Sequence, residues 1–254
     1  LGGGAAAMLI SEGVPVPLSL AMAVFFGFLA GMVTGLIHTR LGVNELFAGI
    51  LTTTGLYSIT LRLMGRSNIP LTDTPAGILH LPDLGMGLDG RWAVGFSLVI
   101  LGLVLLSALL LATDFGLALR ALGNNPTMAR ANGINQRRGL TLGIAAANGL
   151  VALSGALVAT YQGFADVTMG IGSLILGLGM VIVGESVLRP KSIPWALGAV
   201  VLGAVLFRAL IAIALQLGLE PVDLKLTTAL LLLVALAFGR LRLPGVSDPG
   251  RTNR

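Results

Sequence analysis

The sequence is short of cysteine, of charge and of aromatic side chains, and each shortage excludes a class of protein. None of its 254 residues is cysteine, which excludes a disulfide framework, a thiolate metal site and a cysteine nucleophile. Only 11% of the residues are charged and 55% are hydrophobic, whereas a soluble domain carries about a quarter charged residues. The composition therefore predicts a membrane protein rather than one with a large globular core.

The positive charge that is present does not indicate a nucleic-acid-binding protein. The formal net charge is +5 and the isoelectric point is about 10.7. The basic residues, however, stand at the ends of apolar runs, and aromatic residues make up only 5% of the chain. A nucleic-acid-binding face needs clustered basic residues. We therefore expect no nucleic-acid partner.

Motifs for catalysis are also missing. The patterns H-E-x-x-H, G-x-S-x-G and G-x-x-x-x-G-K-S/T do not occur in the sequence. The two histidines, His38 and His80, fall in connections predicted to lie on opposite sides of the membrane, so they cannot share a metal ion. We expect no catalytic residue and no metal site, and if the protein's function consumes a nucleotide, another chain must bind it.

Long apolar runs recur along the chain. A transmembrane helix needs about 20 residues to cross about 30 Å of hydrocarbon. Full candidates fall at 15–37, 44–63, 92–112, 139–160, 170–188, 194–217 and 225–239. The chain begins with Leu1 inside an apolar run, so we expect 1–10 to be the tail of another span and the true N-terminus to be missing. The predicted fold is an all-α, polytopic transmembrane helix bundle with about seven full spans and a partial one.

The basic residues predict how these spans are oriented. If 114–138 is cytoplasmic, then 38–43, 189–193 and 240–254 share its side, and together they hold 11 of the 16 Lys and Arg residues. Cytoplasmic connections carry such an excess. Residues 1–242 then form one transmembrane domain with an external loop at 64–91, either a simple connector or a docking surface for a soluble partner. We expect 243–254 to be a disordered cytoplasmic tail.

The cytoplasmic segment 114–138 contains the signals of a short helix. Asn125 can cap free N–H groups, and Pro126 is suited to the first helical position. Gly133 is a stop signal of the left-handed type. About two turns of helix lie between them, flanked by arginines such as Arg120 and Arg130. The pattern indicates a rigid element held at the membrane surface.

Polar groups inside the spans are candidates for a translocation pathway, because they are costly in hydrocarbon. Arg208 lies near mid-depth of its span, where it serves either as a gate or substrate contact, or as a structural ion pair or hydrogen-bonded anchor. Glu45 and Glu185 lie near span ends, where they reach water. Asn44 and Asn148 are expected to hydrogen-bond between helices. Trp92 and Trp195 begin spans and are read as interfacial anchors.

Glycines fall into two patterns. Gly27, Gly31 and Gly35 are spaced by four residues, as are Gly139 and Gly143, and this spacing is typical of close helix packing. The cluster around Gly177 and Gly179 is denser than packing requires, and it favours a broken or mobile span on a translocation path.

The cytoplasmic segment 114–138, together with part of the span that follows it, resembles a known family. The residues concerned are Arg120-Ala121-Leu122-Gly123-Asn124-Asn125-Pro126, Ala129, Gly133-Ile134-Asn135 and Ser154-Gly155-Ala156-Leu157. They resemble the cytoplasmic loop of ABC-importer permeases of the branched-chain amino acid and ribose type. A second stretch, from His38-Thr39-Arg40-Leu41 to Met64-Gly65, resembles a branch linked to amino-acid uptake. The family has further sequence before the point at which this chain begins.

The resemblance implies a permease subunit of an ATP-driven importer in a bacterial inner membrane. It implies that the short helix couples to a separate ATP-binding subunit through nine residues: Arg120, Gly123, Asn124, Asn125, Pro126, Ala129, Arg130, Gly133 and Ile134. Magnesium-ATP would bind to that subunit, so no cofactor is expected in this chain. The other implied partners are a second permease subunit, identical or different, an external solute-binding protein and the lipid bilayer.

Two other classes were weighed against this one. A secondary transporter driven by an ion gradient should carry carboxylates at mid-depth, and no acidic residue convincingly lies there. An intramembrane enzyme should carry a nucleophile and a base, and the sequence offers no such pair. The sequence does not name the solute, although an amino acid or a related nutrient fits the resemblance.

Overall fold

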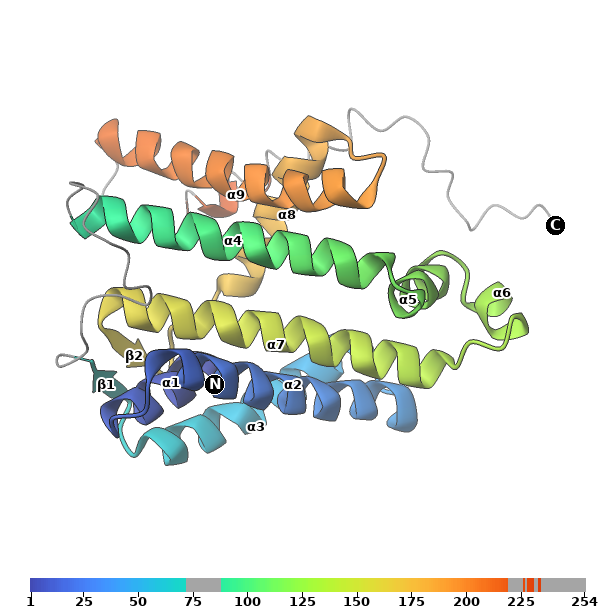
Figure 1. Cartoon of the computed structure of the whole chain (residues 1–254), viewed down its shortest axis with the longest axis horizontal. Helices are drawn as coiled ribbons and strands as arrows, with labels where there is room; N and C mark the ends of the chain where they lie inside the picture. The colour runs from blue at the N-terminus through green and yellow to red at the C-terminus, as the bar shows by residue number, and fades with distance from the viewer. Residues whose placement is uncertain (72–87, 219–225, 227, 231–232, 234–254) are drawn as a thin grey trace. The chain divides into compact units, whose positions relative to one another are not determined.

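The computed structural model describes residues 1–71, 88–218, 226, 228–230 and 233 (Figure 1). The chain divides into two compact units, Leu1–Gly170 and Ile171–Arg254. Most of the predicted span 225–239, the predicted tail 243–254 and most of the external loop lie outside the described residues. Whether 1–242 behaves as one domain stays a prediction.

The first unit is mainly helical. Its elements are α1 (Gly2–Ser11), α2 (Val16–Leu41), α3 (Glu45–Met64), β1 (Asn68–Pro70), α4 (Leu88–Ala112), α5 (Asp114–Asn124), α6 (Pro126–Ala131), α7 (Gln136–Gln162) and β2 (Phe164–Asp166). The second unit contains α8 (Ser173–Leu188) and α9 (Ile193–Gln216). Among the described residues five helices, α2, α3, α4, α7 and α9, are long and apolar enough to cross a membrane. They coincide with predicted spans, and the predicted total of about seven stays a prediction.

Helices α2 and α7 form the centre of the first unit, and they run antiparallel with their backbones in close contact. A methyl group added at Gly31 would lie 2.7 Å from Ala145 Cα, and one added at Gly35 would lie 2.8 Å from Thr141 Cα. Gly27 meets the same helix around Gly149. Small residues allow this approach, and the backbones gain packing contacts along the whole contact line. The predicted role of Gly27, Gly31 and Gly35 is confirmed.

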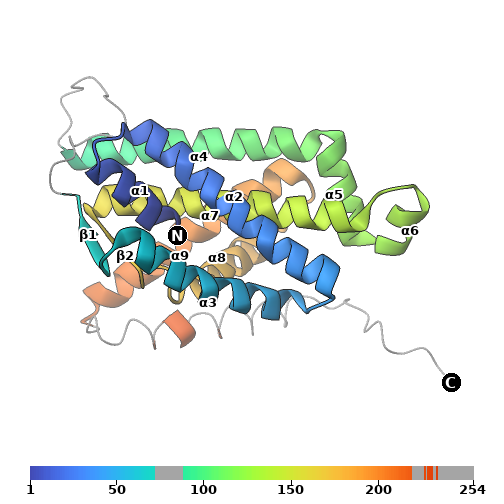
Figure 2. The same ribbon diagram turned by 90° about the horizontal axis from the view of Figure 1, so that it is seen from below.

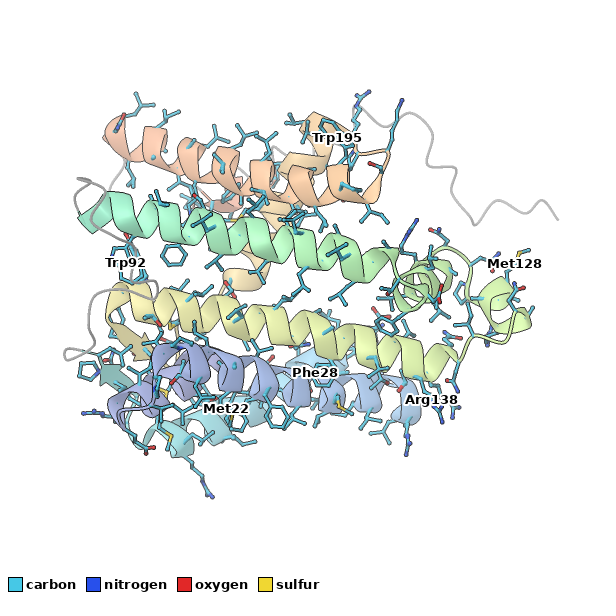
Figure 3. All side chains as sticks on the ribbon, in the orientation of Figure 1. Met22, Phe28, Trp92, Met128, Arg138 and Trp195 are labelled. Carbon is cyan, nitrogen blue, oxygen red and sulfur yellow. The ribbon has the colours of Figure 1, made fainter. Side chains whose placement is uncertain are left out.

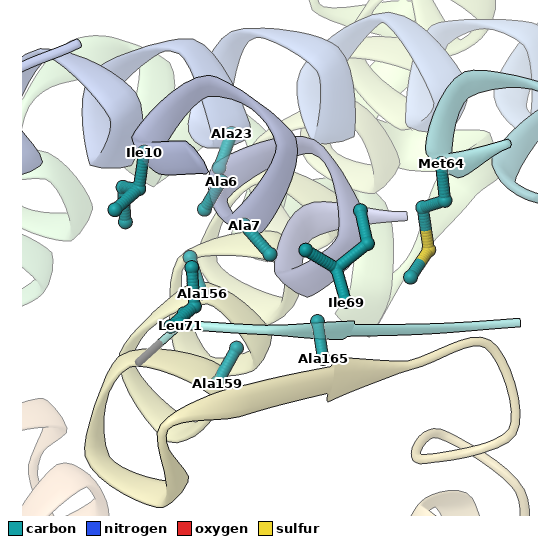
Figure 4. Close-up of a cluster of buried hydrophobic side chains, with 10 residues drawn as sticks. All are labelled: Ala6, Ala7, Ile10, Ala23, Met64, Ile69, Leu71, Ala156, Ala159 and Ala165. Carbon is teal, nitrogen blue, oxygen red and sulfur yellow. The ribbon is translucent and has the colours of Figure 1, made fainter. Parts of the chain in front are cut away.

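The end of the unit opposite α6 is closed by a buried apolar cluster and a pair of short strands (Figure 4). Strands β1 and β2 pair antiparallel with Ile69 opposite Ala165. The cluster consists of Ala6, Ala7, Ile10, Ala23, Met64, Ile69, Leu71, Ala156, Ala159 and Ala165. The prediction of an external loop at 64–91 did not include β1, because a three-residue strand with a proline carries no period-two signal.

The two ends of the unit agree with the predicted orientation. Because α2 and α7 are antiparallel, the end of α2 at Leu41 lies beside the start of α7 at Gln136, near the segment 114–138 (Figure 2). The paired strands join the connections after α3 and after α7 at the other end. The connections expected on one side of the membrane therefore share one end of the unit.

In the second unit α8 and α9 pack through another pair of glycines. A methyl group added at Gly203 would lie 2.8 Å from Gly184 Cα. Helix α8 begins only at Ser173 and has 16 residues, so Gly170 and Gly172 precede the helix instead of interrupting it. The expected span 170–188 is therefore shorter than a straight crossing needs.

A capped helix as the candidate coupling site

Helix α6 begins and ends with the two caps that the sequence predicts. Asn125 has an extended backbone, and its side chain accepts a hydrogen bond from Met128 N at 3.0 Å. Pro126 occupies the first helical turn, where its missing N–H costs nothing. Gly133 has φ = +82°, and it lets the chain turn back so that Ile134 N donates to Ala129 O at 3.1 Å. Both ends of a helix only six residues long are therefore held by hydrogen bonds.

Helix α5, which leads into α6, was missed by the sequence reading. That reading treated 114–124 as part of a loop because of its polarity. In the structure Thr113 caps the helix by accepting from Gly116 N at 3.4 Å. Asn125 N then donates to Ala121 O at 3.0 Å. Asn125 therefore ends α5 and starts α6. Its two hydrogen bonds fix the corner at which the two helices meet.

The apolar face of α5 rests on α7 through two leucines. A methyl group added at Gly139 would lie 2.5 Å from Leu122 Cδ1, and one added at Gly143 would lie 2.8 Å from Leu119 Cδ1. Leu122 is only 3% exposed. The close helix contact predicted from the spacing of Gly139 and Gly143 is confirmed, but its partners are leucine side chains of α5 and not the α5 backbone. These glycines make room for the two leucines, and they join the cytoplasmic segment to the central helix α7.

The outer surface of α6 is free of other described parts of the chain. Met128, in the middle of the helix, is 65% exposed and lies on its outer side (Figure 3). Arg130 is exposed, and its Nε donates to Pro126 O at 3.3 Å. Ala129, on the inner side, is only 3% exposed. An exposed methionine beside an exposed arginine offers both apolar contact and positive charge to a partner.

The structure places the nine predicted coupling residues in one continuous corner. Arg120, Gly123 and Asn124 lie in the last turns of α5. The remaining six lie in the cap, in α6 or in the turn after it: Asn125, Pro126, Ala129, Arg130, Gly133 and Ile134. Arg120 is exposed, as are Gly123 and Asn124. Their contacts with an ATP-binding subunit stay a prediction.

Neighbouring side chains connect the ends of α2, α3 and α7 on this side of the unit. The Oγ1 atoms of Thr39 and Thr141 lie 3.0 Å apart. His38 Nδ1 lies 2.8 Å from Val43 O, and its Nε2 lies 3.5 Å from Glu45 Oε1. A cavity of about 220 Å³ is lined by His38, Thr39, Gln136, Arg137 and Leu140. These contacts hold the ends of α2, α3 and α7 together on the side of the unit from which α5 and α6 extend.

The predicted pathway residues are distributed over both units. Asn148 lies on α7, and Arg208 lies on α9 with an exposed side chain. Gly177 and Gly179 lie on α8, the first exposed with open space around it and the second buried. The structure gives Arg208 no ion pair with a described residue. The four residues stay predictions as pathway residues.

Two asparagine side chains form hydrogen bonds with the backbone of their own helices, although bonds between helices were expected. Asn44 was expected to bond to another helix, but it caps α3 by accepting from Leu46 N at 2.9 Å. Asn148 Nδ2 donates to Ile144 O, one turn earlier in α7, at 2.9 Å. A short polar side chain finds its own backbone more readily than a distant partner.

Trp92 does more than mark a membrane interface. Its ring centroid lies 5.8 Å from that of Phe96 and 5.6 Å from that of Tyr161, so the ring joins the start of α4 to the end of α7. The spacing of Trp92 from Phe96 is one helical turn, but the contribution of Tyr161 could not be read from the sequence. Trp195, in contrast, is exposed at the start of α9, as an interfacial anchor would be.

At the opposite end, Asp166 is fixed in its charged form. Thr168 donates to its carboxylate both from the hydroxyl and from the backbone N–H, the latter at 2.7 Å. These bonds, first that of the hydroxyl and then that of the backbone, hold the pKa of Asp166 below its usual value. The carboxylate accepts the hydrogen bonds that hold a tight turn after β2, and it does not act as a proton carrier.

Five described helices are long and apolar enough to cross a membrane, which indicates an integral membrane protein. The chain matches the family described as "Branched-chain amino acid transport system / permease component" over residues 1–237. It belongs to this family, and it is a transmembrane permease subunit of an ABC importer.

Individual relatives agree with the family. The chain is 35% identical to a tyrosine transport system permease protein of Clostridioides difficile over 96% of this chain and 80% of that protein. It is 31% identical to a Rickettsia prowazekii protein over 87% of this chain and 80% of the relative. A nucleoside ABC transporter permease protein of Lactococcus lactis is 25% identical over 56% of this chain and 42% of its own length. No solved structure matches. Nothing among these relatives favours a secondary transporter.

Proposed function

We propose that α6 is the coupling helix of this permease and that it docks into a separate ATP-binding subunit. The observation that carries the proposal is the corner itself. Its two helix ends are hydrogen-bonded through Asn125 and Gly133, while Met128 and Arg130 are exposed. A short helix fixed at both ends transmits a displacement, whereas a flexible loop absorbs it.

The contacts of α5 give the displacement a route into the membrane. A push on α6 reaches α7 along the chain through the turn at 132–135, where Asn135 caps α7 by accepting from Arg138 N at 3.1 Å. It also reaches α7 sideways through Leu119 and Leu122 in the spaces above Gly143 and Gly139. Because α7 and α2 are in backbone contact, both helices would move together.

The proposed importer moves an amino acid, of which tyrosine is the first candidate. The relative with 35% identity is a tyrosine transport system permease protein, and it is matched over nearly the whole of this chain. The proposed assembly contains two permease subunits, two ATP-binding subunits and an external solute-binding protein in a bacterial inner membrane. This chain would be non-catalytic, with magnesium-ATP bound by its partner.

Charge reversal at the corner tests the docking. We expect the double variant Arg120→Glu/Arg130→Glu to insert normally but to lose co-purification of the ATP-binding subunit, because both side chains are exposed at the corner. Arg62→Glu/Arg66→Glu is the matched control, since both arginines are exposed near the opposite end of the unit. Equal co-purification with the two double variants would refute the docking, and tyrosine uptake that survives ATP depletion would refute the ABC mechanism.

A further inference from the structure

Helix α3 exposes hydroxyl groups where a lipid-facing helix would expose only apolar side chains. Along one face, on adjacent turns, lie the exposed side chains of Thr53, Thr54, Tyr57 and Ser58. Residues four apart in a helix share a face, which groups Thr53 with Tyr57 and Thr54 with Ser58. Helix α3 is also the least apolar of the five candidate spans.

These hydroxyl groups lie near the middle of the helix. Helix α3 has 20 residues, so at 1.5 Å per residue it is about 30 Å long, the thickness of the hydrocarbon core. Thr53 and Thr54 stand at its midpoint, and Tyr57 and Ser58 follow one turn later. Solute sites of transporters lie at this depth.

The rest of α3 is anchored, which fixes the direction of the hydroxyl face. Ala48 and Thr60 are buried, with Thr52 and Leu56 half-buried between them on the same stripe. At the end of the helix, Met64 Sδ would lie 2.7 Å from a methyl group added at Gly4 of α1. The helix therefore cannot rotate to hide its hydroxyl face without losing these contacts.

The hydroxyl groups retain capacity to bind a ligand. Thr53 Oγ1 and Thr54 Oγ1 donate to Gly49 O and Ile50 O at 2.8 and 2.9 Å, which leaves their oxygen lone pairs as acceptors. The Tyr57 hydroxyl, on a side chain that is 49% exposed, makes no hydrogen bond to a described residue. It can donate and accept.

A comparison with α4 excludes the reading that exposure alone explains this face. Helix α4 is exposed along its middle as well, but there it carries Leu101, Leu105, Leu106 and Leu109. That composition suits lipid. Polar side chains on the bilayer-depth surface of a helix mark a water-filled path or a protein contact instead.

We propose that the α3 face formed by Thr53, Thr54, Tyr57 and Ser58 lines the water-filled solute path and contacts the solute directly. The ligand it fits is a small zwitterion. The threonine oxygens can accept from an ammonium group, and the Tyr57 hydroxyl can donate to a carboxylate. The choice of an amino acid as the solute rests on the proposed function. The position of the water-filled path along α3 rests on the exposed hydroxyl groups alone.

The absence of cysteine from these 254 residues makes this directly testable, since each introduced thiol is the only one among them. The full chain, in its complex in membrane vesicles, would carry Thr53→Cys, Thr54→Cys, Tyr57→Cys or Ser58→Cys. Leu101→Cys and Leu105→Cys on α4 are the matched controls. A membrane-impermeant thiol reagent should label the α3 set at least about tenfold faster than the controls, because a thiol reacts as its thiolate, which forms in water. L-Tyrosine should slow the labelling.

Each result decides a separate point. Labelling of the α3 set as slow as that of Leu101→Cys overturns the proposal, as does a spontaneous disulfide between two copies through Thr54→Cys, which would show a subunit contact instead. Where the parent takes up L-tyrosine, unchanged labelling in its presence overturns the solute contact. Where the parent takes up none, the proposed solute fails, while the labelling still decides whether α3 lines the path.

Discussion

Two sets of glycines with the same spacing do different jobs in this protein. On α2, Gly27, Gly31 and Gly35 face the backbone of α7, so an added methyl group at Gly31 would meet Ala145 Cα. On α7, Gly139 and Gly143 face only the ends of leucine side chains from α5. Backbone atoms cannot move aside without separating the helices, whereas a leucine can change rotamer. The first contact therefore has no room for an added side chain, whereas the second can accommodate one by a change of leucine rotamer.

The largest expected effect comes from breaking the backbone contact between α2 and α7. Gly31→Leu should destabilise the first unit by at least about 3 kcal/mol, because the added side chain must force α2 and α7 apart. The midpoint of thermal unfolding in mild detergent measures this. Gly102→Leu is the control, since Gly102 of α4 has open space around it. Equal midpoints for the two variants would show that α2 and α7 do not need the close approach.

A smaller effect should follow from removing a leucine side chain from the contact between α5 and α7. Leu122→Ala removes a buried side chain and should weaken the seating of α5 by about 2–3 kcal/mol, because it leaves a cavity over Gly139. Faster amide hydrogen exchange in α5 and α6, with little change in α2, would record it. Leu117→Ala is the control on the same helix, since Leu117 is 50% exposed. If exchange rises equally in α2, the two contacts are not independent.

The smallest effect is expected when one glycine of each set is replaced by alanine, which compares the two sets through the same chemical change. Gly139→Ala should cost less than about 1.5 kcal/mol, since Leu122 can rotate away, whereas Gly31→Ala should cost about 1–3 kcal/mol against a fixed backbone. The difference in thermal midpoint between these variants is the measurement. Should Gly139→Ala prove the more destabilising, α5 would be held as rigidly as α2.

The sequence predicted best where the controlling interaction is local. The caps of α6 at Asn125 and Gly133 were both found, because each acts within a few residues of its own position. Five of the predicted spans were placed within a few residues of the observed helices for the same reason. Helix α5 was missed because its apolar face becomes visible only once Leu119 and Leu122 have a surface to cover. The pairing of β1 with β2 was missed because its partners lie about 100 residues apart in the chain.

The sequence by itself determined that this chain crosses a membrane, which connections of the first unit share one end, and that a capped basic helix stands at that end. Hydropathy, charge and cap chemistry are properties of short segments. Only the tertiary structure decided which glycines meet backbone and which meet side chains, and that α3 turns Thr53, Thr54 and Tyr57 outward. Which face of a helix is covered depends on the neighbours that pack against it, and those neighbours come from distant parts of the chain.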